Sequence, residues 1–207
     1  HDLIKETISA HKRIIFNGNN YASAWREEAK ARGLLELPTT PDAVPHILAD
    51  KNIQLFERQK VYTKEEVYSR YEMALENYGK RIAIEAHTML EMTDKQIIPA
   101  IITYSKHIAK AANEKKAFLP DIDLSCEEKR LRRLTELLNG ISRMNEQLDS
   151  LLANIPQDVE ILEKALYYRD QVFALMQNMR TLVDEAETMV DKAIWPFPDY
   201  GDLLVTK

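Results

Sequence analysis

Residues 63–108 read TKEEVYSRYEMALENYGKRIAIEAHTMLEMTDKQIIPAIITYSKHI, and this stretch decides the fold. Large, mostly apolar side chains recur along it at steps of four and three residues, which is the period of an amphipathic helix. Thr63 and Glu66 have the spacing of a capping box that opens a helix. Pro99 predicts a kink and Gly79 a weaker point. The positions in this period are Val67, Tyr71, Leu75, Tyr78, Ile82, Ala86, Met89, Thr93, Ile97, Ile101, Tyr104 and Ile108.

Two further long helices follow in the sequence. Ser125, with Glu128 three residues later, predicts a helix over 125–153, and a tight turn then separates it from a last helix over 158–194. Asn145 falls where a core residue is due, as polar residues that set the register do in coiled coils. The predicted core positions are Leu131, Leu134, Leu138, Ile141, Leu148, Leu152, Ile155, Leu162, Leu166, Phe173, Met176, Met179, Val183, Ala186 and Val190.

The N-terminal part of the chain has shorter periodic segments. We expect helices over 2–15 and 21–32, and Gly33 stands where a glycine ends a helix. Thr40 is the expected cap of a short helix that contains Pro41.

No segment alternates with the period of a β-strand, so the sequence predicts an all-α protein. Residues 113–124 form a polar connection between long helices. We expect an antiparallel bundle of three to four long helices, with the shorter N-terminal helices packed at one end. The predicted domains are 1–62, which holds the short helices, and 63–207, which holds the bundle and a docked C-terminal tail.

The tail after the last helix carries a large apolar load. It reads IWPFPDYGDLL over 194–204, and the prolines at 196 and 198 should end the helix near Trp195. A terminus of this composition should dock on its own bundle or on another protein, because leaving it in water forgoes apolar burial. The predicted interaction residues are Trp195, Phe197, Tyr200, Leu203 and Leu204.

Composition excludes several classes of protein. The net charge of −5, from 28 basic and 33 acidic residues, gives no reason to expect nucleic acid as a partner. No apolar run approaches the ~20 residues that span a membrane, so we expect no membrane partner. The single cysteine, Cys126, fits a reducing compartment and a cytoplasmic location. Because the chain begins with His1 and is helical from the start, we expect a fragment of a longer protein.

The sequence holds no recognisable catalytic, cofactor-binding or metal-binding residues. None of the five histidines follows a glutamate at the Glu-x-x-His spacing of di-iron bundles, and the five glycines are too scattered for a phosphate loop. Cys126 is read as a structural cysteine rather than a reactive one. The basic and acidic run over 127–133 is read as a solvated helix face, with a docking patch as the alternative. Met176, Met179 and Met189 are read as core residues, with a Met-rich peptide groove as the alternative.

Several motifs resemble one enzyme family. DLIKETI over 2–8, HKRIIFNGNNY over 11–21 and VDKAIWPFPDYGDLL over 190–204 closely resemble the C-terminal region of type III glutamine synthetases. Residues 37–43 and 61–72 are similar to the segment that closes the catalytic domain in glutamine synthetases generally. The resemblance covers essentially the whole chain.

That resemblance implies a longer enzyme that makes glutamine from glutamate, ammonia and ATP through γ-glutamyl phosphate, with Mg²⁺ or Mn²⁺ as cofactor. No position here matches the family's metal-binding or phosphate-binding residues, which precede this region. Asn20 stands where the family pattern has Gly, and both residues tolerate left-handed backbone. The family's stacked rings imply a homo-oligomer.

Two classes of function therefore stay open. The chain is either an assembly and regulatory region of a ligase, without active-site residues of its own, or a stand-alone cytosolic helical adaptor that binds a partner protein in a bundle groove.

Overall fold

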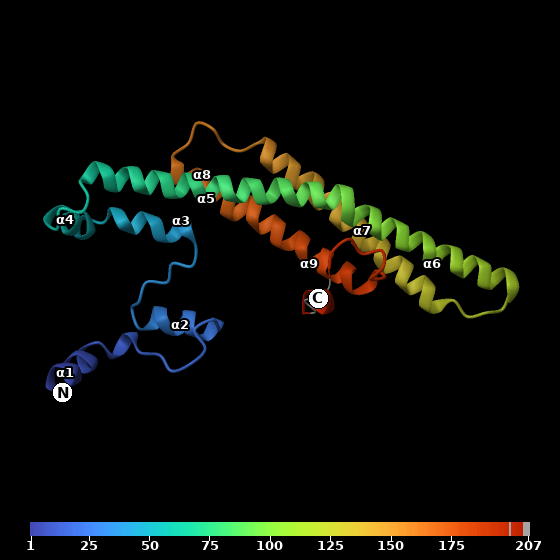
Figure 1. The fold of residues 1–207 in the computed structure, drawn as a ribbon, viewed down its shortest axis with the longest axis horizontal. Helices are drawn as coiled ribbons and strands as arrows, with labels where there is room; N and C mark the ends of the chain where they lie inside the picture. Colours follow the sequence, from blue (N-terminus) through green and yellow to red (C-terminus); the bar gives the residue numbers. More distant parts are fainter. Residues whose placement is uncertain (199, 205–207) are drawn as a thin grey trace. The chain divides into compact units, whose positions relative to one another are not determined.

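The structure is a computed structural model that describes residues 1–198 and 200–204, and all its regular elements within those residues are helices (Figure 1). The predicted all-α class is confirmed. The chain divides into two compact units, His1–Tyr71 and Glu72–Lys207, and each is described by itself. The predicted boundary at 62/63 and the packing of short helices at one end of the bundle stay predictions.

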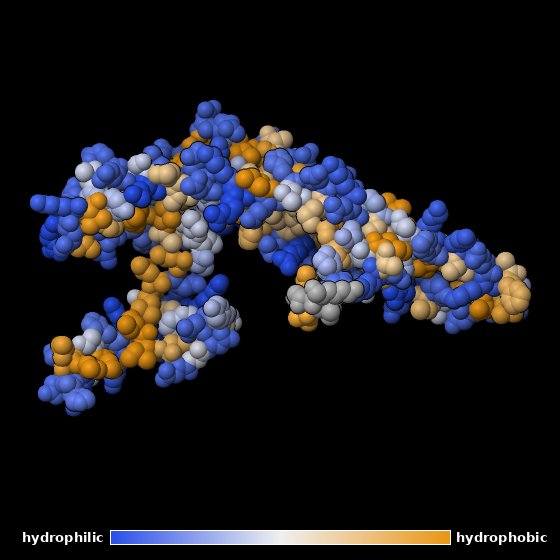
Figure 2. Space-filling view, in the orientation of Figure 1, coloured by the Kyte–Doolittle hydropathy of each residue, from blue (hydrophilic) through white to orange (hydrophobic). Residues whose placement is uncertain are grey.

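The first unit is a series of short helices and turns, and it displays many apolar residues on its surface (Figure 2). The expected helix over 2–15 is interrupted, because α1 ends at Ala10 and the chain tightens into a 3₁₀ turn before Ile15. The elements are α1 (Asp2–Ala10), η1 (Lys12–Ile14), α2 (Ser23–Ala31), α3 (Thr40–Ala43), η2 (Val44–Leu48) and α4 (Asp50–Arg58).

An aromatic pair and one arginine hold the turn between η1 and α2. The rings of Phe16 and Trp25 lie 4.3 Å apart, and the guanidinium of Arg32 lies 6.0 Å and 5.8 Å from them. Arg32 Nη1 donates to the carbonyl of Ile15 at 2.6 Å. Gly18 is required here, because a Cβ at this position would meet Phe16 Cζ at 2.5 Å. These contacts hold the backbone around Ile15 and Phe16 against α2.

Two helix ends in this part of the chain follow the expected chemistry, and a third is shifted by one residue. The Thr63–Glu66 capping box forms, with Thr63 N donating to Glu66 Oε2 at 2.7 Å and Glu66 N to Thr63 Oγ1 at 3.3 Å. Gly33 has a φ of 68° after α2, as expected for a helix-ending glycine. The cap of α3 is Thr39 rather than Thr40, because the carbonyl of Thr39 accepts from Ala43 N at 3.0 Å and so closes the first helical turn one residue earlier.

The stretch over 64–118 is a continuous helical run made of α5 (Lys64–Met92), a π turn η3 (Thr93–Ile97) and α6 (Ile98–Phe118). The π turn lies just before Pro99, whose nitrogen cannot donate to the preceding turn, so the irregularity expected at the proline is taken up there. Every predicted periodic position from Val67 to Ile108 is buried or half-buried. The helix also continues through the first half of the expected connection over 113–124, because α6 ends only at Phe118.

Two more helical runs pack beside it in the second unit. They are α7 (Ser125–Ala153) and the run of α8 (Ile161–Tyr167), a π turn η4 (Tyr168–Phe173) and α9 (Ala174–Met189). Figure 1 shows α7 running back along α6, and α7 also packs against α9. The start of α7 is held by Asp123 Oδ1, which accepts from Ser125 N at 2.9 Å, so Ser125 is the first helical residue and not the cap.

Two contiguous apolar clusters form the core of this unit. The first joins α6, α7, the end of α9 and Trp195; its fully buried side chains include Ile101, Leu134 and Ile141. The second joins α5, α7, η4 and α9; its buried members include Leu148, Val172 and Met179. These three helical runs therefore share one interior, as a helix bundle requires.

Asn145 faces that interior, as predicted. Its side chain is 7% exposed, and its Nδ2 donates to Asp94 Oδ1 in the π turn η3 at 2.7 Å. This bond disfavours sliding of α7 along its neighbour, because any other register would separate the buried Nδ2 from its partner on the facing turn.

The last helical run differs from expectation at two places. It ends at Met189, where Val190 is extended at ψ 143°, and not at Trp195. Phe173 is exposed while its neighbour Val172 is fully buried. The π turn η4 explains the second difference, because its wider turn moves the buried face by about one residue relative to an uninterrupted 3.6-residue period.

Candidate functional site

The tail turns back on the bundle at Asp191. The Oδ1 of Asp191 accepts from Ala193 N at 2.7 Å, and its carbonyl accepts from the backbone nitrogens of Ile194 and Trp195 at 2.9 Å each. An aspartate that bonds to backbone groups two residues on is a local turn former. This turn, rather than the prolines, redirects the chain and brings Trp195 to the core.

Trp195 and Phe197 dock within the chain. Trp195 is 9% exposed and belongs to the same apolar cluster as Ile97 and Val190, and Phe197 packs half-buried against that cluster. The two rings meet edge to face, with centroids 6.0 Å apart and planes at 78°. The buried Nε1 of Trp195 has no hydrogen-bond partner among the described residues.

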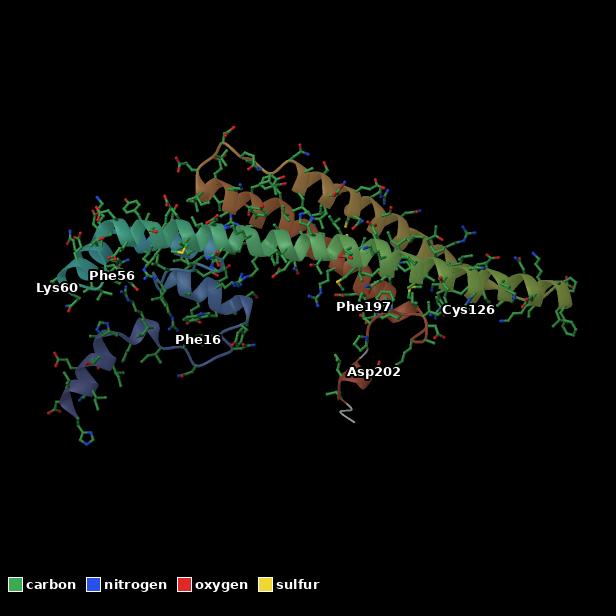
Figure 3. All side chains as sticks on the ribbon, turned by 45° about the horizontal axis from the view of Figure 1, so that its top comes forward. Phe16, Phe56, Lys60, Cys126, Phe197 and Asp202 are labelled. Atoms are coloured by element: carbon green, nitrogen blue, oxygen red, sulfur yellow. The ribbon has the colours of Figure 1, made fainter. Side chains whose placement is uncertain are left out.

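The rest of the tail is held differently. Residues 200–204 form the short helix α10 (Tyr200–Leu204), and Lys192 Nζ lies 2.9 Å from Asp202 Oδ1 (Figure 3). Leu203 and Leu204 are 64% and 80% exposed. The side chain of Tyr200, the fifth predicted interaction residue, lies outside what the structure describes. The structure thus brings two of the predicted residues to the core and leaves two on the surface.

Trp195 and Phe197 also close one end of a groove between α5 and α9, which we call the α5–α9 groove. It has a volume of about 440 Å³. Each wall contributes residues that are three or four positions apart, so the groove follows about two turns of each helix. Its apolar lining is Ile84, Met89, Met92, Ile97, Val183, Trp195 and Phe197.

Acidic side chains dominate the polar lining of the α5–α9 groove. Glu85 lies on the α5 wall, and Asp184 and Glu187 lie on the α9 wall with one base, Arg180. Arg180 Nε lies 3.5 Å from Asp184 Oδ2, so these two charges offset each other. Glu85 and Glu187 have no ion-pair partner among the described residues. The groove therefore combines an apolar floor with two unpaired negative charges.

Sequence reasoning missed this groove, although Ile84 was a signal for it. Ile84 lies off the periodic core face of its helix and is 67% exposed. The alternative of a Met-rich peptide groove concerned other methionines. Of these, Met176 and Met179 are buried in the core, as the interpretation as core residues predicted. The methionines that line the groove are Met89 and Met92.

The charged run over 127–133 joins helices of the same chain. Arg133 makes a two-point contact with Glu185 on α9, with Nε to Oε1 at 2.6 Å and Nη2 to Oε2 at 2.7 Å. Arg130 Nη2 donates to the carbonyl of Met189 at 2.7 Å. Hydrogen bonding from Arg133 lowers the pKa of Glu185, and the same pairing raises the pKa of Arg133. These contacts fasten α7 to the end of α9.

Two kinds of feature are absent from the described residues. No group of three or more His, Cys, Asp or Glu side chains there is placed to hold a metal ion. No helix among them is long and apolar enough to cross a membrane. Cys126, at the start of α7, is exposed.

Comparison with known proteins gave one family and several relatives. The family model for the glutamine synthetase C-terminal domain matches residues 1–116. A glutamine synthetase of Butyrivibrio fibrisolvens is 40% identical over 206 residues, which are 98% of this chain and 29% of that protein. A type-3 glutamine synthetase of Dictyostelium discoideum is 32% identical over 98% of this chain and 28% of its own length. A glutamine synthetase of Bacteroides fragilis is 24% identical over 99% of this chain and 29% of its own length. The chain thus spans less than a third of the length of these relatives.

Proposed function

The chain belongs to the glutamine synthetase C-terminal domain family, and we propose that it is the helical C-terminal region of a glutamate–ammonia ligase, where it makes subunit contacts. Relatives that match over 98% of the chain support this role over that of a stand-alone adaptor.

The reaction that we propose for the whole enzyme is the ATP-dependent ligation of ammonia to glutamate in the cytoplasm. Mg²⁺ or Mn²⁺ would neutralise charge on the transferred phosphoryl group, as in phosphoryl transfer generally. We assign no catalytic, cofactor-binding or metal-binding role to residues 1–207. In this proposal the active site belongs to the part of the enzyme outside this chain.

The observation that carries the assembly role is the division within the tail. Trp195 is buried in the chain's own core, whereas Leu203 and Leu204 on α10 are 64% and 80% exposed. An exposed ion pair between Lys192 and Asp202 joins α10 to the segment that precedes it. Adjacent exposed leucines on an anchored helix suit a contact with a second subunit. The assembly that we propose is a homo-oligomer of stacked rings.

The test is to shorten the whole enzyme after Pro198. This removes α10 and leaves Trp195 and Phe197 in place, so the subunit should still fold. We expect sedimentation velocity to show smaller assemblies than for the intact enzyme. Replacing both Leu203 and Leu204 by serine should have the same effect without shortening the chain. Assemblies of unchanged mass in both variants would refute the contact.

A second test addresses the absence of catalytic residues. The 207-residue chain alone should form no glutamine from glutamate, ammonia and Mg-ATP, and a calorimetric titration with Mg-ATP should be silent. Saturable binding at micromolar concentrations would contradict our assignment. The whole enzyme, assayed in parallel, is the positive control.

A further inference from the structure

The α5–α9 groove has features that the assembly role of α10 does not use. Its walls run from Glu85 to Met92 and from Arg180 to Glu187, which is about 10 Å of each helix at ~1.5 Å per residue. A trough of this length between two helices accommodates about two turns of a third helix, which would lay apolar side chains into it at steps of three and four.

The lining specifies the occupant further. Val183 and the exposed Ile84 offer apolar contact on opposite walls, and Met89 adapts to different side-chain shapes. The unpaired Glu85 and Glu187 favour an occupant that carries positive charge beside its apolar side chains. A neutral helix would leave these carboxylates without partners, and an acidic one would be repelled.

The closed end of the groove is already in place without an occupant. Trp195 is fixed by the core, and Phe197 is fixed against it edge to face. Because these rings need not be ordered on binding, the entropy cost of docking falls mainly on the occupant.

We propose that the α5–α9 groove binds a basic amphipathic helix of another protein, with leucine-type anchors on the groove floor and Lys or Arg facing Glu85 and Glu187. This goes beyond the assembly role and does not depend on it, since α10 is not part of the groove lining.

The probe is a synthetic helical peptide of about 14 residues with Leu at steps of four and three and Lys beside them. The full chain carrying Trp25→Phe keeps Trp195 as its only tryptophan, so fluorescence reports on the groove directly. We expect saturable binding that weakens with added salt, because the screening length falls from about 10 Å at 0.1 M to about 3 Å at 1 M. A matched peptide with Glu in place of each Lys should bind at least about tenfold more weakly.

Matched variants of the chain locate the site. Combining Glu85→Lys with Glu187→Lys should weaken binding of the Lys peptide at least about tenfold, because two attractions become repulsions. Combining Glu146→Lys with Glu163→Lys changes the net charge by the same amount at two exposed positions outside the groove lining, and should leave binding nearly unchanged. Ile84→Ser should weaken binding as well, whereas Ile102→Ser, at a position on α6 that is 51% exposed, should leave it unchanged. Both isoleucines are surface residues, so neither change should unfold the chain.

Three results would overturn the proposal. The first is no saturable binding of the Lys peptide to the folded chain. The second is binding that neither Ile84→Ser nor reversal of Glu85 and Glu187 weakens. The third is self-association of the chain that Ile84→Ser abolishes, which would assign the groove to a second copy instead. Because α10 stays intact in every variant, failure here leaves the assembly test unaffected.

Discussion

Gly79 and Gly140 both lie within long helices, where glycine costs stability, but their surroundings differ. A Cβ on Gly79 would meet Cδ2 and Cε2 of the Tyr168 ring at 2.9 Å, and that ring is buried. A Cβ on Gly140 would meet only the Cδ1 of Leu182 at 2.8 Å, the end of a flexible side chain.

We therefore predict opposite outcomes for the two alanine substitutions. Gly79→Ala should destabilise the bundle by about 1–3 kcal/mol, because a rigid ring must shift to make room. Gly140→Ala should be neutral or stabilising, because Leu182 can turn aside while the helix gains up to about 1 kcal/mol of propensity. Denaturant unfolding of both variants checks this. Equal effects would mean that Tyr168 yields as easily as Leu182.

Glu185 should make the stability of the bundle depend on pH. Its pKa is lowered from the ordinary value of 4.5 by hydrogen bonding with Arg133, so it binds its proton less tightly in the folded chain. The contribution of the ionised Glu185 to the free energy of unfolding is complete above about pH 4.5. It is lost as the pH falls through the lowered pKa of the folded chain. Glu185→Gln should therefore destabilise the chain at about pH 7 and much less at about pH 3.

Urea unfolding at the two pH values measures this difference. Glu146→Gln is the control, because Glu146 is exposed on α7 and has no ion pair among the described residues. If Glu185→Gln destabilised the chain equally at both pH values, the pairing with Arg133 would not be the source of its contribution.

Among the helices, α7 is the central one, since it packs against both α6 and α9. Leu148 on α7 is fully buried, whereas Leu138 on the same helix is half-buried against the first core cluster. Leu148→Ala should cost about 2–5 kcal/mol, and Leu138→Ala should cost less because it removes less buried surface. Chemical denaturation gives both free energies. A larger cost at Leu138 than at Leu148 would contradict this ranking by buried surface.

The two π turns act on whole helices. The turn at η3 places Asp94 against Asn145, and the turn at η4 buries Tyr168 and Val172 while it exposes Phe173. The turn at η4 therefore changes which face of its helix meets the core. A single extra residue per turn is enough, because the apolar stripe of an α-helix is narrow.

For the second unit as a whole, the part of the tail that holds Trp195 and Phe197 belongs to the folded core. Ending the chain after Ala193 removes Trp195, whose loss should cost about 3–5 kcal/mol, as for other large buried aromatics. For a chain of this size that corresponds to a fall in melting temperature of about 6–20 °C.

Ending the chain after Pro198 is the matched control. It keeps Trp195 and Phe197 and removes the exposed Leu203 and Leu204, so the melting temperature should change little. Thermal melts followed by circular dichroism compare the two. Equal melting temperatures would show that the docked aromatic rings add nothing to the bundle.

Local patterns in the sequence were enough for much of this fold. The period over 63–108 placed the core face of α5 and α6, because neighbouring turns of one helix share a face whatever lies opposite. Thr63 and Glu66 were enough to place a helix start, since both partners of a capping box lie within one turn. Asn145 was correctly placed inside, and the apolar composition of the tail correctly indicated docking for Trp195.

Contacts between segments that are distant in the sequence decided the rest. The π turn at η4 satisfies the packing of Tyr168 and Val172 on α5 and α7, which no period within α8 and α9 records. The α5–α9 groove exists because two helices and the tail, separated by about 100 residues along the chain, leave a trough between them. Periodicity specifies which side of a helix is apolar, but the partner, and the space left beside it, depend on how separate helices pack together.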